Sequence, residues 1–230
     1  FVDISTVEDR LRGKNTIVHE FIGKVSGWCR ERFIPVDYDA DGRLWHVLYC
    51  VENIDEEKRR EDRLMYLAQI DLMTGIRNRG SGENKITEYL VRKQCGLLCL
   101  LDCDKFKSIN DTYGHAVGDK VIIAIADTLR KSCRDDDVVL RLGGDEFAVF
   151  IPGMLDKERA EAFFDRLFSN IEHIDIAEMN GKNILLSLGA CFYDGIECIT
   201  FDQLYRRADI AMYDSKKKQG YSATIFDAQQ

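Results

Sequence analysis

Two adjacent carboxylates, Asp145 and Glu146, directly follow a pair of glycines and stand between two apolar runs, residues 138–142 and 147–151. Glycines permit a tight reversal of the chain, so the pattern predicts two strands joined by a turn with both acids at its tip. Acidic residues are common in turns for local reasons alone. A second acidic strand end, which lies upstream in the chain, favours a functional role for the pair.

That second strand end is Asp102, which closes an apolar run, residues 97–103, typical of a buried strand. Hard divalent cations take oxygen ligands, and Mg²⁺ commonly uses one or two carboxylates together with the phosphate oxygens of a substrate. Asp102, Asp145 and the backbone carbonyl of Cys103 could provide half of such a site. Lys107 on the same loop could meet a terminal phosphate as a compact cation. Simple solvation of a strand-end loop is the alternative explanation for these charged residues.

A turn-rich segment, residues 110–115, leads to Asp119 near the start of the next expected helix. An acid in this place is favoured by the helix dipole, which is a sufficient structural explanation. A carboxylate that faces a pocket can also accept the two N–H donors of guanine, and the Asn110 amide can complement the other edge of the base. Adenine lacks that donor pair, so a site of this kind would prefer GTP.

Alternating helices and strands must position these residues. The order strand, helix, hairpin, helix, strand predicts an α+β fold with a ferredoxin-like β-α-β-β-α-β palm, in which an antiparallel sheet is flanked by helices. In that arrangement the first strand lies beside the central hairpin, so Asp102 converges with Asp145 and Glu146. The expected helices lie at 84–94, 117–132, 156–171 and 201–217, and the expected strands at 97–103, 138–142, 147–151, 183–192 and 223–226.

The N-terminal part has a different pattern. Strand-like runs at 28–36 and 44–51, separated by a turn, predict an antiparallel pair in an N-terminal β-piece. A strongly charged helix follows from residue 53 to residue 70 and cannot bury a broad face, so we expect an exposed connecting helix that could pair with a second copy of itself. The expected organisation is therefore an N-terminal piece (1–54), a connecting helix (55–70) and a larger domain (71–230).

Composition excludes several classes of function. The chain has 230 residues, 45% of them hydrophobic, and a formal net charge of −8, which argues against a nucleic-acid partner. It contains no run of about 18 apolar residues and no signal peptide, so we expect no direct membrane contact and a cytoplasmic location. The chain begins with Phe1, so we interpret it as a fragment of a longer protein, which could itself be tethered to a membrane.

Eight cysteines are many for a protein of this size. No two of them form a Cys-x-x-Cys pair, and none has a histidine at the spacing typical of zinc sites. We therefore expect small buried residues in a reducing compartment rather than metal ligands or disulfides.

The segment Arg141-Leu-Gly-Gly-Asp-Glu-Phe147 resembles the signature of GGDEF-domain diguanylate cyclases. Three further segments resemble other motifs of that family and follow in the same order along the chain. Residues 71–79 resemble its opening motif, residues 102–119 its metal and guanine segment, and residues 208–216 its final helix. This agreement covers about 155 residues, from 71 to 226, and is far more specific than the short signature alone.

The resemblance implies a reaction. Two GTP molecules would condense to cyclic di-GMP with release of two pyrophosphates, in the presence of Mg²⁺ or Mn²⁺. Each subunit of a homodimer would hold one GTP, and each 3′-hydroxyl would attack the α-phosphate of the opposite nucleotide. The positions of Asp102, the Cys103 carbonyl and Asp145 match metal ligands of the family. Asp145 also matches the position proposed to help deprotonate the hydroxyl, and Glu146 matches a second active-site carboxylate.

The same resemblance assigns the nucleotide contacts. Lys107 and Lys216 match lysines that bind phosphates. Asn110 and Asp119 match positions that contact guanine, and His115 matches a further nucleotide contact.

One departure from the family concerns the segment after Lys216. The family usually continues with Gly-Arg-Asn, and the arginine assists phosphate binding, whereas this chain has Lys-Lys-Gln-Gly-Tyr. Lys217 or Lys218 could substitute, but a lysine does not reproduce the two-pronged donor geometry of arginine. We expect weaker binding of GTP rather than inactivity.

Arg134 and Asp137 have the Arg-x-x-Asp spacing and the register of the family's inhibitory site, where the product cyclic di-GMP binds. Arg166 is a candidate secondary contact. An exposed charged turn between a helix and a strand is the alternative explanation, since a four-residue match alone is weak.

Residues 1–54 resemble the closing strands of a PAS sensory domain that runs into its signalling helix. This resemblance rests on pattern rather than motifs. A sensor of this kind could bring two half-sites together by shifting the population of competent dimers.

Two other functions remain open from the sequence. A degenerate domain could bind GTP or cyclic di-GMP as a receptor without turnover, although the intact acids argue against it. A different nucleotidyl cyclase or polymerase-like enzyme could use a similar palm, and its preference for ATP over GTP would separate it.

Overall fold

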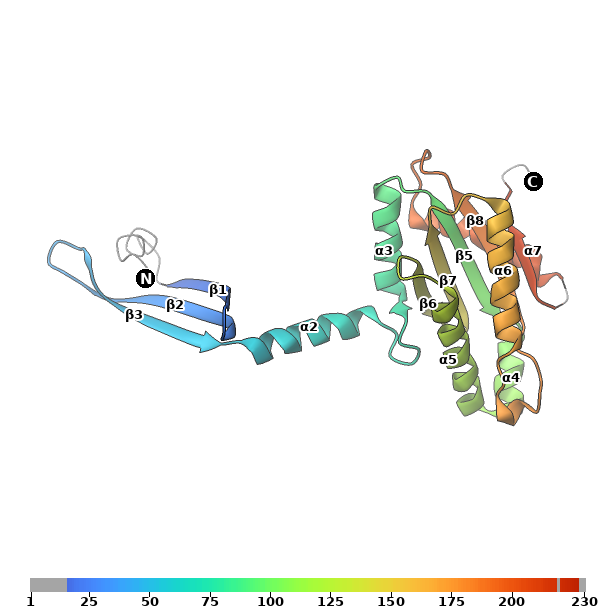
Figure 1. Ribbon diagram of the computed structural model, residues 1–230, viewed down its shortest axis with the longest axis horizontal. Helices are drawn as coiled ribbons and strands as arrows, with labels where there is room; N and C mark the ends of the chain where they lie inside the picture. Colours follow the sequence, from blue (N-terminus) through green and yellow to red (C-terminus); the bar gives the residue numbers. More distant parts are fainter. Residues whose placement is uncertain (1–15, 219, 228–230) are drawn as a thin grey trace. The chain divides into compact units, whose positions relative to one another are not determined.

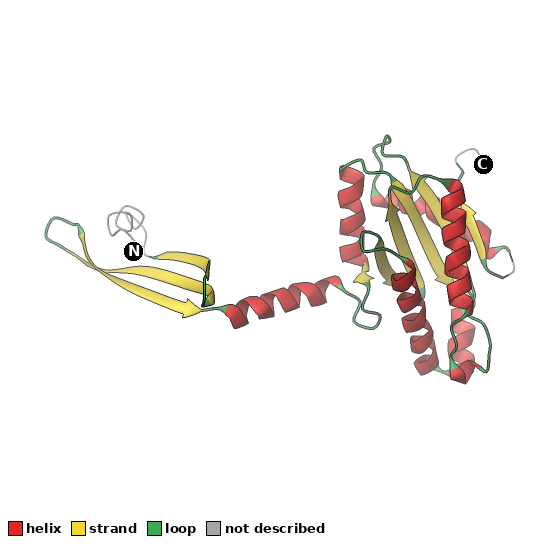
Figure 2. Ribbon diagram, viewed as in Figure 1, coloured by secondary structure: helices red, strands yellow, loops and turns green. Residues whose placement is uncertain are grey.

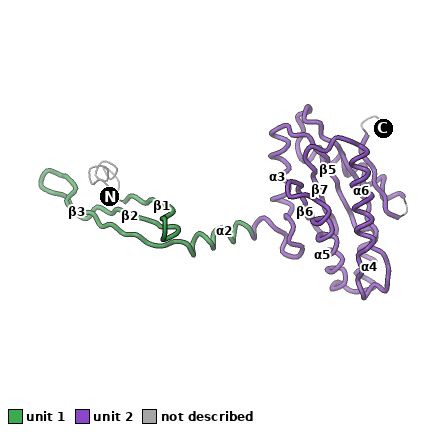
Figure 3. Tube along the Cα trace, in the orientation of Figure 1, with its two compact units in different colours: residues 1–66 green, residues 67–230 purple. Residues whose placement is uncertain are grey.

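The computed structural model describes residues 16–218 and 220–227. The chain divides into two compact units, residues 1–66 and residues 67–230, which are described separately (Figure 3). No helix among the described residues is long and apolar enough to cross a membrane.

The first unit contains a three-stranded antiparallel sheet of β1 (Ile17–Gly23), β2 (Gly27–Tyr38) and β3 (Leu44–Asn53), in that order. The two predicted strands and the turn between them are confirmed. Strand β1 was not predicted, because polar residues such as His19 and Glu20 interrupt its apolar pattern.

Helix α2 (Asp55–Gln69) begins directly after β3. The Asp55 carboxylate accepts the backbone N–H of Trp28 at 2.7 Å, and Glu57 pairs with Arg30 of β2 at 2.7 Å, so the first turn of the helix is fastened to the sheet. The helix buries none of its residues, as the sequence predicts for an exposed connecting helix.

The second unit is built on a six-stranded sheet (Figure 2). Its four inner strands are antiparallel in the order β6-β7-β5-β8, which is the strand order of a ferredoxin-like palm, while β4 and β9 add parallel edges. The predicted α+β fold is therefore confirmed. The strands are β4 (Arg77–Asn78), β5 (Gly96–Cys103), β6 (Val138–Gly143), β7 (Glu146–Pro152), β8 (Leu186–Tyr193) and β9 (Ser222–Ile225).

Helices cover both faces of this sheet (Figure 1). Apolar residues of α5 and α6 pack in one cluster against one face, and those of α3 and α7 pack in a second cluster against the other. The helices are α3 (Arg79–Val91), α4 (Phe106–Tyr113), α5 (His115–Ser132), α6 (Lys157–Glu172) and α7 (Phe201–Lys216), with a 3-10 turn at Ala177–Met179.

Strand β5 shows why the sheet is buried on both sides. Leu97, Cys99 and Leu101 point into the α5–α6 cluster, and Leu98 and Leu100 point into the α3–α7 cluster, each of them at most 1% exposed. Continuous apolar residues therefore hold this central strand, and they place its polar end, Asp102, at the edge of the core.

Three expected elements differ in detail. Helix α4 forms where a turn-rich segment was expected, because Ile109 is buried in the core and Gly114, with a φ of 86°, both ends α4 and precedes α5. Helix α3 starts at residue 79 rather than 84, because the Asn78 side chain accepts the Ser81 N–H at 3.0 Å and caps it. Strand β8 starts at residue 186 rather than 183.

All eight cysteines are free thiols. Cys29, Cys99, Cys103 and Cys191 are buried, as expected. The expectation of burial is wrong for Cys50 and Cys198, which are exposed because they lie on a solvent-facing strand and in a surface loop.

Gly189 of β8 lets α7 approach the sheet closely. A methyl group there would collide with the backbone of Ala208 and Met212 in α7. We therefore expect Gly189→Ala to lower the free energy of unfolding by about 1–3 kcal/mol in denaturant titrations. The control is Gly80→Ala in α3, which meets only Asn78 at 3.9 Å and should leave stability unchanged or raise it by up to about 1 kcal/mol. Equal effects of the two substitutions would contradict the close approach.

Candidate active site

The hairpin of β6 and β7 carries the two signature acids. Asp145 lies in its turn and Glu146 is the first residue of β7, and both side chains are half-buried. Gly144 has a φ of 54°, a left-handed conformation that favours glycine, so the turn depends on this residue type.

The predicted convergence of the strand ends is present. Strands β5 and β7 pair so that Asp102 lies directly opposite Glu146. Directly opposed residues of a ladder point to the same face of the sheet. Asp145, in the turn just before Glu146, adds a third carboxylate to this end of the sheet.

Lys216, the last residue of α7, extends to the same place. Its Nζ lies 2.9 Å from Oδ2 of Asp102. The preceding residue fixes the end of the helix, because the buried Ser215 hydroxyl donates to the Leu188 carbonyl of β8 at 2.7 Å. The structure therefore brings together four of the predicted site residues: Asp102, Asp145, Glu146 and Lys216.

Burial and mutual repulsion disfavour charge on the acids at this site. Burial, then the negative charge of Asp102, raise the pKa of Asp145, partly opposed by a hydrogen bond from its own backbone amide. Burial and the charges of Asp102 and Asp145 likewise raise the pKa of Glu146. Burial would lower the pKa of Lys216, but the hydrogen bond to Asp102 and the negative charges of Asp102, Glu146 and Asp104 together outweigh it, so the pKa is raised. The site therefore favours a bound cation.

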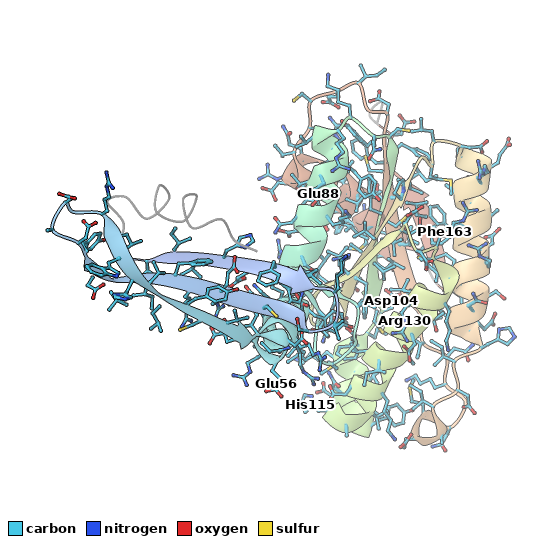
Figure 4. All side chains as sticks on the ribbon, turned by 60° about the vertical axis from the view of Figure 1, so that its left-hand side comes forward. Glu56, Glu88, Asp104, His115, Arg130 and Phe163 are labelled. Carbon is cyan, nitrogen blue, oxygen red and sulfur yellow. The ribbon has the colours of Figure 1, made fainter. Side chains whose placement is uncertain are left out.

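Asp104 belongs to this cluster but was not among the predicted site residues. Its Oδ1 accepts the Ser187 hydroxyl at 2.8 Å, and its backbone N–H donates to the Leu185 carbonyl at 2.9 Å. Burial raises its pKa as well. The signal in the sequence was the repeat of aspartates two positions apart, 102 and 104, at a strand end (Figure 4 labels Asp104).

The donor set fits a hard divalent cation. The side chain of Cys103 is buried in the core at 1% exposure, so only its backbone carbonyl is available as a donor beside the carboxylates of Asp102 and Asp145. Within the described part of the chain, no three His, Cys, Asp or Glu side chains are grouped as a complete metal site. Two carboxylates and a carbonyl form a partial shell, which suits Mg²⁺ completed by the phosphates of a substrate.

The predicted nucleotide contacts lie on the two helices that follow β5. Helix α4 begins without a side-chain cap, so its first N–H groups and Lys107 in its first turn are available to an anion. Asn110 lies against Gly118 of α5, next to Asp119, and a side chain at Gly118 would collide with the Asn110 amide. His115 is the first residue of α5 and is exposed (Figure 4).

These contacts form a group separate from the acids. Among residues 16–218 and 220–227, no hydrogen bond or ion pair joins the side chains of Lys107, His115 or Asp119 to the carboxylates at the hairpin tip. The two groups share the connection from β5 to α4, so a single ligand would have to span from one to the other.

Neither lysine after Lys216 contacts the acids at the hairpin tip. Lys217 pairs with Asp214 at 2.7 Å and stacks over the Tyr213 ring at 4.3 Å. Lys218 donates to the Thr224 hydroxyl at 3.1 Å. Both ammonium groups are therefore engaged away from Asp102.

A cleft of about 250 Å³, whose lining does not include the acids, brings together the three residues predicted for product inhibition. Arg134, Asp137 and Arg166 all line it, and the Arg134 backbone N–H donates to the Asp137 carboxylate at 2.7 Å. Burial raises the pKa of Asp137. Arg166 stacks over the ring of Phe163, 5.6 Å from its centroid.

Sequence reasoning missed Arg159, which also lines this cleft. It lies in the first turn of α6 and has no motif around it, so only the packing of α6 beside β7 could have identified it. With Arg134 and Arg166 it gives the cleft three guanidinium groups, a lining suited to an anionic ligand.

Comparison with known proteins identifies the larger unit. Residues 68–222 match the family described as "Diguanylate cyclase, GGDEF domain". The chain belongs to this GGDEF family. The match does not extend to the N-terminal sheet, for which the comparisons give no PAS domain.

Named relatives agree with this assignment. The chain is 35% identical over 175 residues to diguanylate cyclase DgcM of Escherichia coli, which covers 74% of the chain and 41% of DgcM. The chain thus spans less than half the length of this relative.

Solved structures of GGDEF domains share the fold. The GGDEF domain of TpbB from Pseudomonas aeruginosa is 30% identical, with a TM-score of 0.62 over 69% of this chain and 94% of that one. The GGDEF domain of DgcB from Caulobacter crescentus, solved in complex with cyclic di-GMP, is 25% identical, with a TM-score of 0.61 over 69% of this chain and 95% of that one.

The repulsion among the acids of the GGDEF domain predicts that neutralising Asp145 stabilises the fold, whether by mutation or by a bound cation. Because the pKa of Asp145 is raised on folding, its charged form costs stability at neutral pH, and this cost disappears as the pH falls through the raised pKa. Asp145→Asn should therefore raise the melting temperature without metal. Added Mg²⁺ should stabilise the parent protein and have little effect on the variant.

Thermal unfolding with and without EDTA measures both effects. The control is Asp175→Asn, which changes an exposed aspartate. Its melting temperature without metal and its stabilisation by Mg²⁺ should both equal those of the parent protein. An equal response of parent and Asp145→Asn to Mg²⁺ would place the cation elsewhere.

Proposed function

We propose that this GGDEF domain is a diguanylate cyclase that condenses two GTP into cyclic di-GMP and two pyrophosphates. The observation that carries the proposal is the convergence of Asp102, Asp145, Glu146 and Lys216 at one end of the sheet. In each half-reaction the 3′-oxygen bonds to the α-phosphorus of the other nucleotide. The bond from that phosphorus to the bridging oxygen breaks, and pyrophosphate leaves with its electron pair.

Asp102, Asp145 and the Cys103 carbonyl would hold Mg²⁺ or Mn²⁺, and Glu146 would add a further carboxylate. The bound cation supplies neutralisation of phosphate charge and activation of the attacking hydroxyl. Asp145 also helps to remove the proton of the 3′-hydroxyl.

The chain's cations and amide groups would hold GTP. Lys107 and Lys216 bind phosphates, and the uncapped start of α4 adds backbone N–H donors. Asn110 and Asp119 recognise guanine, supported by the close packing of Asn110 on Gly118, and His115 completes the nucleotide contacts. With Lys217 and Lys218 engaged elsewhere, we expect weaker GTP binding than a terminal arginine would give.

Each domain holds one GTP, so turnover requires two copies with their sites facing each other. We propose a homodimer joined in part through α2, which exposes the apolar side chains of Leu64, Met65, Tyr66 and Leu67. The proposed organisation is a PAS-like sensory part at 1–54, a signalling helix at 55–70 and the cyclase at 71–230. The antiparallel strands β2 and β3 running into α2 support the sensory assignment. Use of GTP fits a cytoplasmic location.

The test of turnover is incubation with GTP and Mg²⁺ after removal of bound nucleotide, with chromatographic detection of cyclic di-GMP. We expect Asp145→Asn to reduce the rate at least about 100-fold and the exposed control Asp175→Asn to leave it unchanged. No product from the parent protein, at concentrations that force dimers, would favour a receptor for GTP or cyclic di-GMP. Turnover of ATP in preference to GTP would indicate a different nucleotidyl cyclase.

The cleft lined by Arg134, Asp137 and Arg166 is the proposed inhibitory site, in which these residues would hold cyclic di-GMP. Arg134→Ala should raise the concentration of cyclic di-GMP needed for half-inhibition at least about tenfold without changing kcat, since the cleft lies apart from the acids. The matched control is Arg130→Ala, an exposed arginine of α5 whose partner is Asp127. If cyclic di-GMP inhibits Arg134→Ala as strongly as it inhibits the parent protein, the cleft is not the inhibitory site.

A further inference from the structure

Arg141 of β6 makes contacts in the GGDEF domain that have no part in the proposed mechanism. Its side chain is only 13% exposed. Its Nε and Nη2 both donate to the Gly144 carbonyl, at 3.0 and 2.7 Å, and its Nη1 donates to both carboxylate oxygens of Asp71, at 3.1 and 3.2 Å. One guanidinium therefore ties the hairpin turn to the segment that precedes α3.

Asp71 is itself held firmly. It accepts the backbone N–H and the hydroxyl of Thr74, at 3.0 and 2.7 Å, and its own carbonyl accepts the Gly75 N–H at 2.8 Å. Burial would raise the pKa of Asp71, but the hydrogen bonds from Thr74 and Arg141 outweigh it and lower the pKa. The carboxylate is thus a charged and fixed anchor for Arg141.

The anchor is continuous with the end of α2. The Asn78 side chain donates to the Ala68 carbonyl at 2.7 Å, and the Ser81 hydroxyl donates to the Gln69 carbonyl. Asn78 also pairs with Arg141 in the β4–β6 ladder. The backbone around Asp71 is therefore fixed on both sides, by the last turn of α2 and by the sheet.

The Gly144 carbonyl and the Asp145 N–H belong to the same peptide unit. The described residues contain no cis peptide bond, so these two groups point in opposite directions. With the carbonyl held by Arg141, the Asp145 amide is held on the opposite side of the peptide, and the backbone from which the Asp145 side chain projects is fixed. The guanidinium thereby determines the orientation of the peptide that carries Asp145.

We propose that Arg141 and Asp71 are positioning residues that fix the Gly144–Asp145 peptide and, through it, the carboxylate of Asp145. The inference rests on the proposed function for its effect on turnover, but the fixed peptide is a property of the domain itself. A lysine cannot replace Arg141, because its single ammonium cannot bind the carbonyl and the carboxylate in one rigid plane.

The experiment compares Asp71→Asn and Arg141→Lys with matched controls from a surface ion pair, Asp127→Asn and Arg130→Lys. Arg130 and Asp127 lie 2.7 Å apart on the exposed face of α5, so the controls break the same kind of contact away from the hairpin (Figure 4 labels Arg130). Two measurements are made on each protein: ¹⁵N relaxation of the Gly144 and Asp145 amides, and steady-state kinetics with GTP and Mg²⁺.

In the parent protein and both controls, we expect order parameters near 0.85 at these amides, the value typical of rigid backbone. In Asp71→Asn and Arg141→Lys they should fall below about 0.6. The kcat should fall about tenfold while KM for GTP changes less than about twofold, because the misplaced group acts on the reaction rather than on binding. The double variant should be no slower than Arg141→Lys alone, since both residues act through one contact.

Rigid amides in Asp71→Asn, or an unchanged kcat per folded molecule, would overturn the proposal and leave the pair a merely stabilising role. If Arg141→Lys does not fold, Asp71→Asn decides alone, because it keeps the guanidinium of Arg141 and removes only the negative charge that holds it against the turn. A parent protein without turnover would refute the proposed function, and the relaxation measurement would still decide whether the pair fixes the turn.

Discussion

Crowding of carboxylates at one end of a buried sheet is the constraint on which this domain depends. Asp102, Asp145 and Glu146 repel one another and are partly removed from water, so the arrangement is unfavourable unless other forces impose it. Apolar packing on both faces of β5 and β7 imposes it, because each fully buried leucine or phenylalanine contributes about 1.5–3 kcal/mol. A slip of one residue would turn these side chains to the wrong faces, so the core that stabilises the sheet also fixes the register that brings the acids together.

Two positively charged side chains near the hairpin have different roles. Lys216 neutralises Asp102 directly, whereas Arg141 binds the turn backbone and is neutralised in its own place by Asp71. The acids therefore keep a net negative charge that can attract a cation, while the turn that carries them is held by a separate ion pair. Full neutralisation of the cluster by the chain itself would leave less free energy for binding metal and nucleotide.

Most of the fold could be predicted from periodicity and turn residues. The hairpin, the buried strand ending at Asp102 and the order of elements followed from apolar runs and glycines, and with them the meeting of the acids. Helix α4 could not be predicted, because its turn-forming residues around Asn110 are overridden by the burial of Ile109. The contact of Arg141 with Gly144 and the place of Arg159 depend on side-chain directions and helix packing, which carry no periodic signal. The sensory character of residues 1–54 stays a prediction from pattern.

The two edges of the large sheet differ from its middle in one respect that matters for assembly. Strands β4 and β9 have only two and four residues, while the strands between them have six to eight. Short edges offer few unpaired backbone groups to a neighbouring chain. In the proposed homodimer, the short edges of this sheet thus disfavour fibrous self-association, and contact between copies is left to helices and side chains, where it can be reversed.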